Sequence, residues 1–99
     1  MKTVIKRDGR AVPFDESRIT EAIFKAGCAT KELGKPQALT LTVEVLQRIM
    51  RNEAMTVEEI QDVVEEVLMD AGYKKTAKAY ILYRAERTRI REGKSDLME

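Results

Sequence analysis

The residues best placed to do chemistry are cations gathered around a predicted turn near the start of the chain. Lys6, Arg7 and Arg10 flank Asp8-Gly9, a pair that favours a hairpin with a type I′ turn. Guanidinium and ammonium groups beside turn amides can hold phosphate oxygens. The same charges also suit a solvated hairpin edge that is protected from aggregation, and spacing alone favours that structural role.

A second group of cations lies on the last predicted helix. At 100° per residue, one side of that helix carries Tyr80, Arg84, Arg87 and Arg91. These arginines could form an anion site, or the late ones could complement the C-terminal dipole of their own helix, and the pattern leaves both open. Tyr80 and Tyr83 could stack on a base or complete the edge of the core, and the core is favoured for at least one of them.

A third candidate is Arg18, in the first turn of a predicted helix, because helix N-termini attract phosphate. The hairpin leads directly into this helix. We therefore expect Lys6, Arg7 and Arg18 to converge if the hairpin folds down on the helix.

The remaining side chains argue against a catalytic centre. The chain has no histidine, which is the commonest general base. Its single cysteine, Cys28, is expected to be small, inert and partly buried near a helix end. Neither a G-x-x-x-x-G-K-[ST] phosphate loop nor a G-x-G-x-x-G fingerprint is present. The acids at 58, 59, 62, 65 and 66 have the spacing of a solvated helix face rather than of paired catalytic carboxylates.

Length and composition indicate one globular domain: the chain has 99 residues, 43% apolar and 35% charged. No apolar run approaches the roughly 18 residues of a membrane helix. The basic start lacks the apolar stretch of a secretory signal, so we expect a cytoplasmic protein. The net charge is +1, with acids concentrated in Glu53 to Asp70 and bases in Tyr73 to Glu92. This segregation suits a local anion site better than extensive nucleic-acid contact.

The elements that must position these groups begin with a hairpin of two strands, Thr3 to Arg7 and Arg10 to Val12, closed by Pro13. A lone hairpin is marginal in water, so we expect it to lie against helices. A first helix should begin after the N-cap Asp15, with a hydrophobic staple of Phe14 and Ile19, and end at Gly27.

Three further helices are predicted after a loop from Cys28 to Lys35. The second begins near Pro36, and its expected core stripe is Leu39, Val43, Leu46 and Met50, widened by Ile49. The third begins at the Thr56–Glu59 capping box and ends at Gly72, with an apolar face of Ile60, Val63, Val64, Val67 and Leu68. The fourth runs from Lys74 to Glu92, with a core side of Ala77, Ile81, Ala85 and Thr88.

This pattern predicts an α+β, mostly helical fold in which an N-terminal β-hairpin packs on a four-helix bundle. Residues 1–92 form the predicted domain, and residues 93–99 form a tail or the start of a linker.

The segment from Val4 to Asp15, followed by Arg18-Ile19 and Ala22-Ile23, resembles the opening of an ATP-cone domain. The Thr-capped acidic helix at 56–70 and the segment Ala79 to Arg84 occur in the same order as in that family, so the resemblance spans about residues 2 to 92. Pro13-Phe14-Asp15 and Tyr83 to Arg87 are most similar to the anaerobic, glycyl-radical ribonucleoside-triphosphate reductases.

The resemblance implies an allosteric domain that binds ATP or dATP, with Mg²⁺ accompanying the triphosphate, and that sets the overall activity of a ribonucleotide reductase. The implied partners are the reductase catalytic domain or subunits, with a nucleotide-dependent oligomer and no membrane. A repressor of reductase genes also carries such a cone and is the alternative. The four-cysteine zinc ribbon of that repressor is missing here, which argues against direct nucleic-acid binding by this chain.

The resemblance also assigns roles to single residues. Val4 matches the strand position whose backbone meets the adenine, and Lys6 and Arg7 match the phosphate-binding pair. Val12 stands where other members carry an acid that meets the sugar. The remaining matches are Arg18 for phosphate, Phe14 and Ile19 for the base pocket, Thr56 (or its neighbour Val57) for a nucleotide-contacting threonine, and Arg87, with Arg84 second, for a late phosphate ligand.

Overall fold

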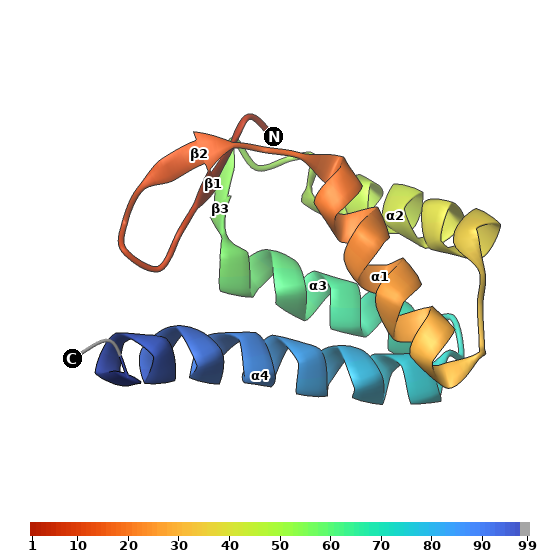
Figure 1. The fold of residues 1–99 in the computed structure, drawn as a ribbon. Coiled ribbons are helices and arrows are strands. Elements are labelled where there is room, and N and C mark those ends of the chain that lie inside the picture. Colours follow the sequence, from red (N-terminus) through yellow and green to blue (C-terminus); the bar gives the residue numbers. More distant parts are fainter. Residues whose placement is uncertain (98–99) are drawn as a thin grey trace.

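The computed structural model describes the backbone of residues 1–97 and the side chains of residues 1–86. Helices dominate, and short strands gather at one end of them (Figure 1). In chain order the elements are β1 (Thr3–Ile5), β2 (Ala11–Pro13), α1 (Glu16–Thr30), α2 (Lys35–Ile49), β3 (Ala54–Thr56), α3 (Val57–Asp70) and α4 (Lys74–Leu97).

The sheet has three strands in the order β2-β1-β3 rather than the two strands of the expected hairpin. β1 and β2 are antiparallel, with Val4 opposite Val12, and β3 is parallel to β1, with Val4 beside Met55. Residues 54–56, which the sequence predicts to be part of a connection and a helix cap, thus also form strand β3. A three-residue strand is too short to show an alternating pattern, and its pairing gives β1 a partner on its second edge.

The hairpin turn has a different geometry from the expected type I′ turn. Gly9 has a φ of +89°, whereas Asp8 keeps a negative φ. The Gly9 amide donates to the carbonyl of Lys6 (2.9 Å), and the Lys6 amide donates to the carbonyl of Arg10 (2.8 Å). This is a type I turn followed by a glycine bulge, in which only one residue needs the left-handed region. The Asp8 carboxylate supports it by accepting from the amide and Nε of Arg10.

Helix α1 begins as predicted and ends later than predicted. Asp15 is the N-cap, and its carboxylate accepts from the amide and hydroxyl of Ser17. The expected stop at Gly27 is wrong, because the helix continues to Thr30 and Lys31 takes the left-handed C-cap with a φ of 60°. Gly27 is instead needed for packing, since a methyl group there would overlap the side chain of Leu33. Cys28 is exposed rather than partly buried.

The predicted core stripe of α2 is confirmed at Ile49 and partly at Leu46 but is wrong at its other three positions, and the N-terminal Pro36 is confirmed. Leu39, Val43 and Met50 are half exposed, at 50%, 53% and 56%, and Leu46 is partly buried. The buried face consists of Ala38, Leu41, Thr42, Val45 and Ile49. Two sides of this helix carry apolar residues, and the choice between them depends on its neighbours. The hydroxyl of Thr42 meets that of Thr20 on α1 (2.7 Å), so a threonine can lie in the interior with its polar group satisfied.

For the third and fourth helices, too, some predicted features are confirmed and others are wrong. The capping box and apolar face of α3 are confirmed, with Val63 partly buried. On α4, Ile81 and Ala85 are exposed, whereas Thr76, Ala77 and Tyr80 are buried. Thr88, also expected in that stripe, lies outside the described side chains. The helix continues through Glu92 to Leu97, past the end that the sequence predicts.

The four helices form a closed ring of contacts in which α1 packs on α2 and α4, and α3 packs on the same two helices. The sheet contacts this bundle through β3 at the start of α3 and through Val4 and Met55, which pack against the core, and the hairpin turn extends beyond them (Figure 1). The α+β, mostly helical class is therefore confirmed, with one strand added. Within the described part of the chain, no helix is both long enough and apolar enough to cross a membrane.

Candidate functional site

The hairpin turn and the start of α3 lie next to each other because β1 and β3 run in the same direction. Ile5 ends β1 and is paired with Thr56, which ends β3 and caps α3. Lys6 and Arg7 follow β1 at the same edge of the sheet. The parallel strand, which the sequence did not predict, therefore brings three of the candidate residues together.

Arg7 binds the first turn of α3 directly. Its Nε donates to Oε1 of Glu58 at 2.7 Å, with the two side chains 43% and 36% exposed. An exposed ion pair of this kind contributes about 0.2–1 kcal/mol. A ligand with more negative charge than one carboxylate can therefore compete for the guanidinium.

Lys6 continues an apolar strip on one face of the sheet. Val4, Val12 and Met55 are directly paired across the three strands and so share a face. Val4 and Met55 pack against the core, and Val12 is partly buried. Strand alternation puts Lys6, two residues after Val4, on the same side. A cation at the end of an apolar strip can bind a molecule with a flat apolar part and an anionic tail.

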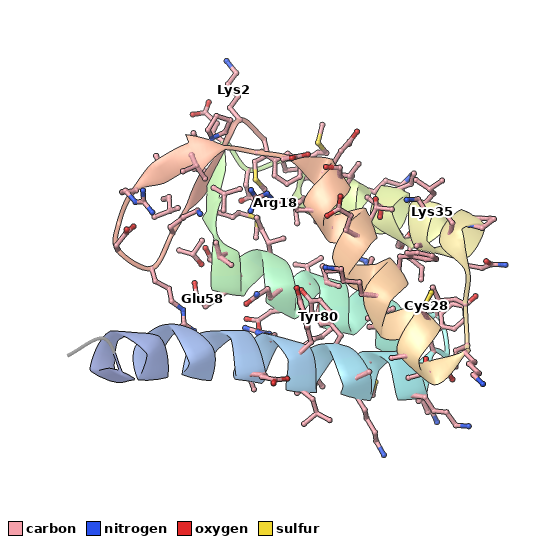
Figure 2. The ribbon with its side chains drawn as sticks, in the orientation of Figure 1. Lys2, Arg18, Cys28, Lys35, Glu58 and Tyr80 are labelled. Carbon is pink, nitrogen blue, oxygen red and sulfur yellow. The ribbon has the colours of Figure 1, made fainter. Side chains whose placement is uncertain are left out.

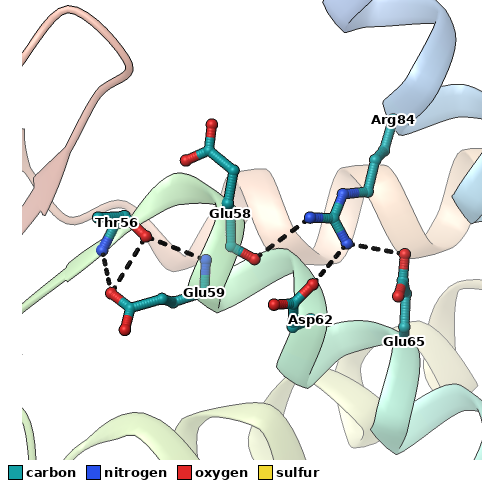
Figure 3. Close-up of polar contacts among 6 residues, drawn as sticks. All are labelled: Thr56, Glu58, Glu59, Asp62, Glu65 and Arg84. Carbon is teal, nitrogen blue, oxygen red and sulfur yellow. Dashed lines mark hydrogen bonds and ion pairs between the residues drawn. The ribbon is translucent and has the colours of Figure 1, made fainter.

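Thr56 is engaged as a helix cap at this edge. Its Oγ1 accepts from the amide of Glu59 (3.1 Å), and its own amide donates to Oε1 of Glu59 (2.9 Å), as Figure 3 shows. The capping box satisfies amides that a phosphate would otherwise meet at a helix N-terminus. Any anion here is bound mainly by the side chains of the hairpin.

Arg18 lies at the other end of the sheet. Because β1 and β2 are antiparallel, α1 starts near Thr3, and the amide of Phe14 donates to the carbonyl of Lys2 (3.0 Å). The strand from Thr3 to Lys6 spans about 10 Å at about 3.3 Å per residue. Figure 2 shows Arg18 on α1, away from Glu58 at the start of α3. Lys6 and Arg7 therefore lie at one end of the sheet and Arg18 lies at the other, rather than all three at one point.

The two apolar candidates on this side of the bundle belong largely to the core. Ile19 is 8% exposed and is part of the buried cluster, and Phe14 packs against that cluster while keeping part of its ring accessible. Only Phe14 therefore offers substantial surface to a ligand.

Arg84 joins α4 to α3. Its Nη1 donates to Asp62 (2.9 Å) and Glu65 (2.8 Å), and its Nη2 approaches the backbone carbonyl of Glu58 (3.4 Å), as Figure 3 shows. Partial burial opposes its charge, but the hydrogen bonds to the two carboxylates outweigh this and raise the pKa of Arg84. The structure thus gives Arg84 two anionic partners within the protein. The side chain of Arg87 lies outside the described residues.

Tyr80 completes the core, as the structural interpretation predicts. It is 4% exposed, and burial raises the pKa of its hydroxyl well above the ordinary value. Tyr83, one of the two tyrosines considered for stacking, is partly buried.

Sequence reasoning missed Glu58, the partner of Arg7. The spacing of the α3 acids places it on a solvated helix face, and its i,i+3 and i,i+4 neighbours do not indicate a partner 51 residues earlier in the chain. Only the parallel pairing of β3 reveals the contact.

A hollow in the described part of the chain lies apart from this site. A shallow hollow of about 300 Å³ between α2 and the α3–α4 connection is lined by Pro36, Gln37, Thr40, Leu41, Ala71 and Tyr73. It contains no cation. No group of three acidic or cysteine side chains in the described part of the chain is arranged to hold a metal ion.

Comparison with known proteins decides the family, since residues 2–89 match the ATP cone domain. The chain belongs to the ATP-cone family. Relatives include the vitamin B12-dependent ribonucleoside-diphosphate reductase of Thermoplasma acidophilum (46% identity over 95% of this chain). The ribonucleoside-diphosphate reductase subunit alpha of Chlamydia pneumoniae is 40% identical over 92% of this chain. The anaerobic ribonucleoside-triphosphate reductase of Escherichia coli is 38% identical over 95% of this chain.

This ATP cone corresponds to a small part of each of those relatives. It spans 13% of the Thermoplasma protein, 10% of the Chlamydia protein and 13% of the Escherichia coli protein. The relatives include both diphosphate and triphosphate reductases, so a cone of this kind is shared by reductases that differ in substrate.

Proposed function

We propose that this ATP cone is a regulatory domain of a ribonucleotide reductase that binds ATP or dATP as an effector. The observation that carries the proposal is the pairing of an apolar strip, Val4–Val12–Met55, with the cations Lys6 and Arg7 at its end. The strip suits an adenine base, and the cations suit a triphosphate. A nucleotide spans the distance between these two kinds of contact.

Each side chain has a defined part in this proposal. The backbone of Val4 and the accessible part of Phe14 meet the base, while Lys6 and Arg7 bind the phosphates. The remaining proposed nucleotide contacts are Arg18, at the end of the sheet near Thr3, and Thr56, at the end near Lys6. Mg²⁺ enters with the triphosphate, whose own oxygens supply most of its ligands. The late arginine is assigned to Arg87 rather than Arg84, because Arg84 already binds two carboxylates.

Regulation requires that the effectors favour different states of the domain, because a ligand that binds two states equally shifts neither. Val12 stands where other cones carry an acid for the sugar, so discrimination between ATP and dATP must arise elsewhere in this cone. The surface that responds is proposed to contact the reductase catalytic domain or a second subunit, through a nucleotide-dependent oligomer in the cytoplasm. Pro13-Phe14-Asp15 and Tyr83 to Arg87 favour the anaerobic triphosphate class, whereas overall identity is higher to a B12-dependent reductase.

The phosphate role is tested by Lys6→Ala with calorimetric titration of ATP and adenosine. Loss of an ammonium that contacts phosphate should weaken ATP binding at least tenfold, about 1.4 kcal/mol, and change adenosine binding less than twofold. Lys2→Ala is the matched control, because Lys2 is exposed at the opposite end of the same strand. An equal loss for both ligands would show that Lys6 supports the fold and not the phosphate.

A further inference from the structure

We propose that Glu58 is an internal competitor for the effector: its carboxylate holds Arg7 when no nucleotide is bound and must be displaced before Arg7 can bind phosphate. This inference rests on the proposed function, and it adds a residue that sets the affinity of the site. Glu58 Oε1 lies 2.7 Å from Arg7 Nε, in the position that a phosphate oxygen would take.

The pairing of Arg7 with Glu58 follows from the sheet register. Ile5 is paired with Thr56 in the parallel β1–β3 ladder, and Arg7 and Glu58 each lie two residues further along. The chain turns away in both strands after the pair, into the hairpin turn and into α3. The register therefore brings the two side chains to the same end of the sheet.

Glu58 is presented by a firmly held turn of helix. The capping box between Thr56 and Glu59 fixes the start of α3, and Arg84 Nη2 approaches the carbonyl of Glu58 itself. Arg84 is in turn held by Asp62 and Glu65. Figure 3 shows the Glu58 carboxylate extending away from the carbonyl that faces Arg84. The backbone of this residue thus contacts α4, while its side chain binds the hairpin.

Electrostatics favours the replacement of the Glu58 carboxylate at Arg7 by a phosphate. The exposed ion pair between Glu58 and Arg7 is weak, and a triphosphate carries several negative charges. A carboxylate and a phosphate cannot both approach Arg7 without repelling each other. Glu58 therefore lowers the apparent affinity for the effector and leaves the cone able to release it. It also returns the hairpin to a defined position on α3 after release.

The test is Glu58→Gln, with ATP and adenosine titrated by calorimetry. We expect ATP to bind about two- to fivefold more tightly, because neither the competing pair nor the repulsion remains. Adenosine, which has no phosphate, should change less than twofold. Glu66→Gln is the matched control, because Glu66 is an exposed acid on the same helix that faces Arg48 of α2 (3.9 Å) instead of the hairpin.

The double variant Arg7→Ala/Glu58→Gln separates competition from general repulsion. If Glu58 acts by occupying Arg7, the gain in ATP affinity should disappear when Arg7 is already absent. A gain that persists without Arg7, an unchanged or weaker ATP affinity in Glu58→Gln, or an equal gain in Glu66→Gln would overturn the inference. Failure of the proposed function is a different result, in which the unmodified chain binds no ATP or Lys6→Ala leaves its affinity unchanged.

Discussion

Single residues in this cone serve either the fold or the ligand, and their contacts show which. Arg7 and Arg84 look equivalent in the sequence, yet the side chain of Arg84 is 20% exposed and contacts Asp62 and Glu65, whereas that of Arg7 is 43% exposed and contacts Glu58. The guanidinium of Arg84 pairs with two carboxylates of α3 and so holds α4 to α3. The more exposed Arg7 is therefore the better placed of the two to bind an external anion.

Glu32 is a residue whose role belongs to the fold. Its Oε1 accepts from the amide (2.6 Å) and hydroxyl (2.8 Å) of Thr76, in the first turn of α4. Partial burial opposes the negative charge, but the hydrogen bonds from Thr76 prevail and hold the pKa of Glu32 below its ordinary value. The contribution of this carboxylate to stability is therefore complete above about pH 4.3 and is lost as the pH falls through the lowered pKa.

Removing this carboxylate should change the acid dependence of stability. In Glu32→Gln, the free energy of unfolding should be lower at pH 7 and should decline less steeply between about pH 5 and pH 3, as measured by urea unfolding. Thr76→Ser keeps both donors, so it should lower stability by a similar amount at every pH. Parallel curves for the wild type and Glu32→Gln would contradict the role of the charge.

At the scale of elements, the sequence predicts local features well and mutual packing poorly. The N-caps Asp15 and Thr56 and the first-turn proline Pro36 depend only on neighbouring residues, and all three are confirmed. The inward face of α2 depends on which of two apolar sides meets α1 and α3. The strand β3 depends on pairing with β1, whose residues are 51 positions away in the chain. These features require knowledge of partners that no local pattern contains.

The link between α3 and α4 gives a prediction at this scale. Arg84→Ala removes two charged hydrogen bonds and leaves Asp62 and Glu65 next to each other without a cation between them. We expect the free energy of unfolding to fall by about 1–3 kcal/mol, as measured by chemical unfolding. ATP affinity should change less than twofold in the variant that remains folded. A large loss of ATP affinity without a loss of stability would instead make Arg84 a phosphate ligand.

In the whole molecule, the sheet lies at one end of a closed helical bundle, and Val4 and Met55 pack against the core (Figure 1). The sequence predicted the bundle, the hairpin and the cations Lys6 and Arg7. It could not predict that the parallel strand would set these cations against α3 and leave Arg18 at the other end of the sheet. One part of the candidate site, the hairpin with its cations, follows from a local motif, and the other part, the contact with α3, follows from the long-range pairing of β1 with β3.

The central claim is that the effector binds along the hairpin and the start of α3, and backbone amide chemical shifts measured during an ATP titration test it most directly. We predict the largest changes at residues 4–7 and 56–58, with little change around the hollow formed by Pro36, Thr40 and Tyr73. Adenosine should reproduce the changes at Val4 more fully than those at Arg7 and Glu58. Saturable changes centred on the hollow, with the hairpin unaffected, would contradict the claim.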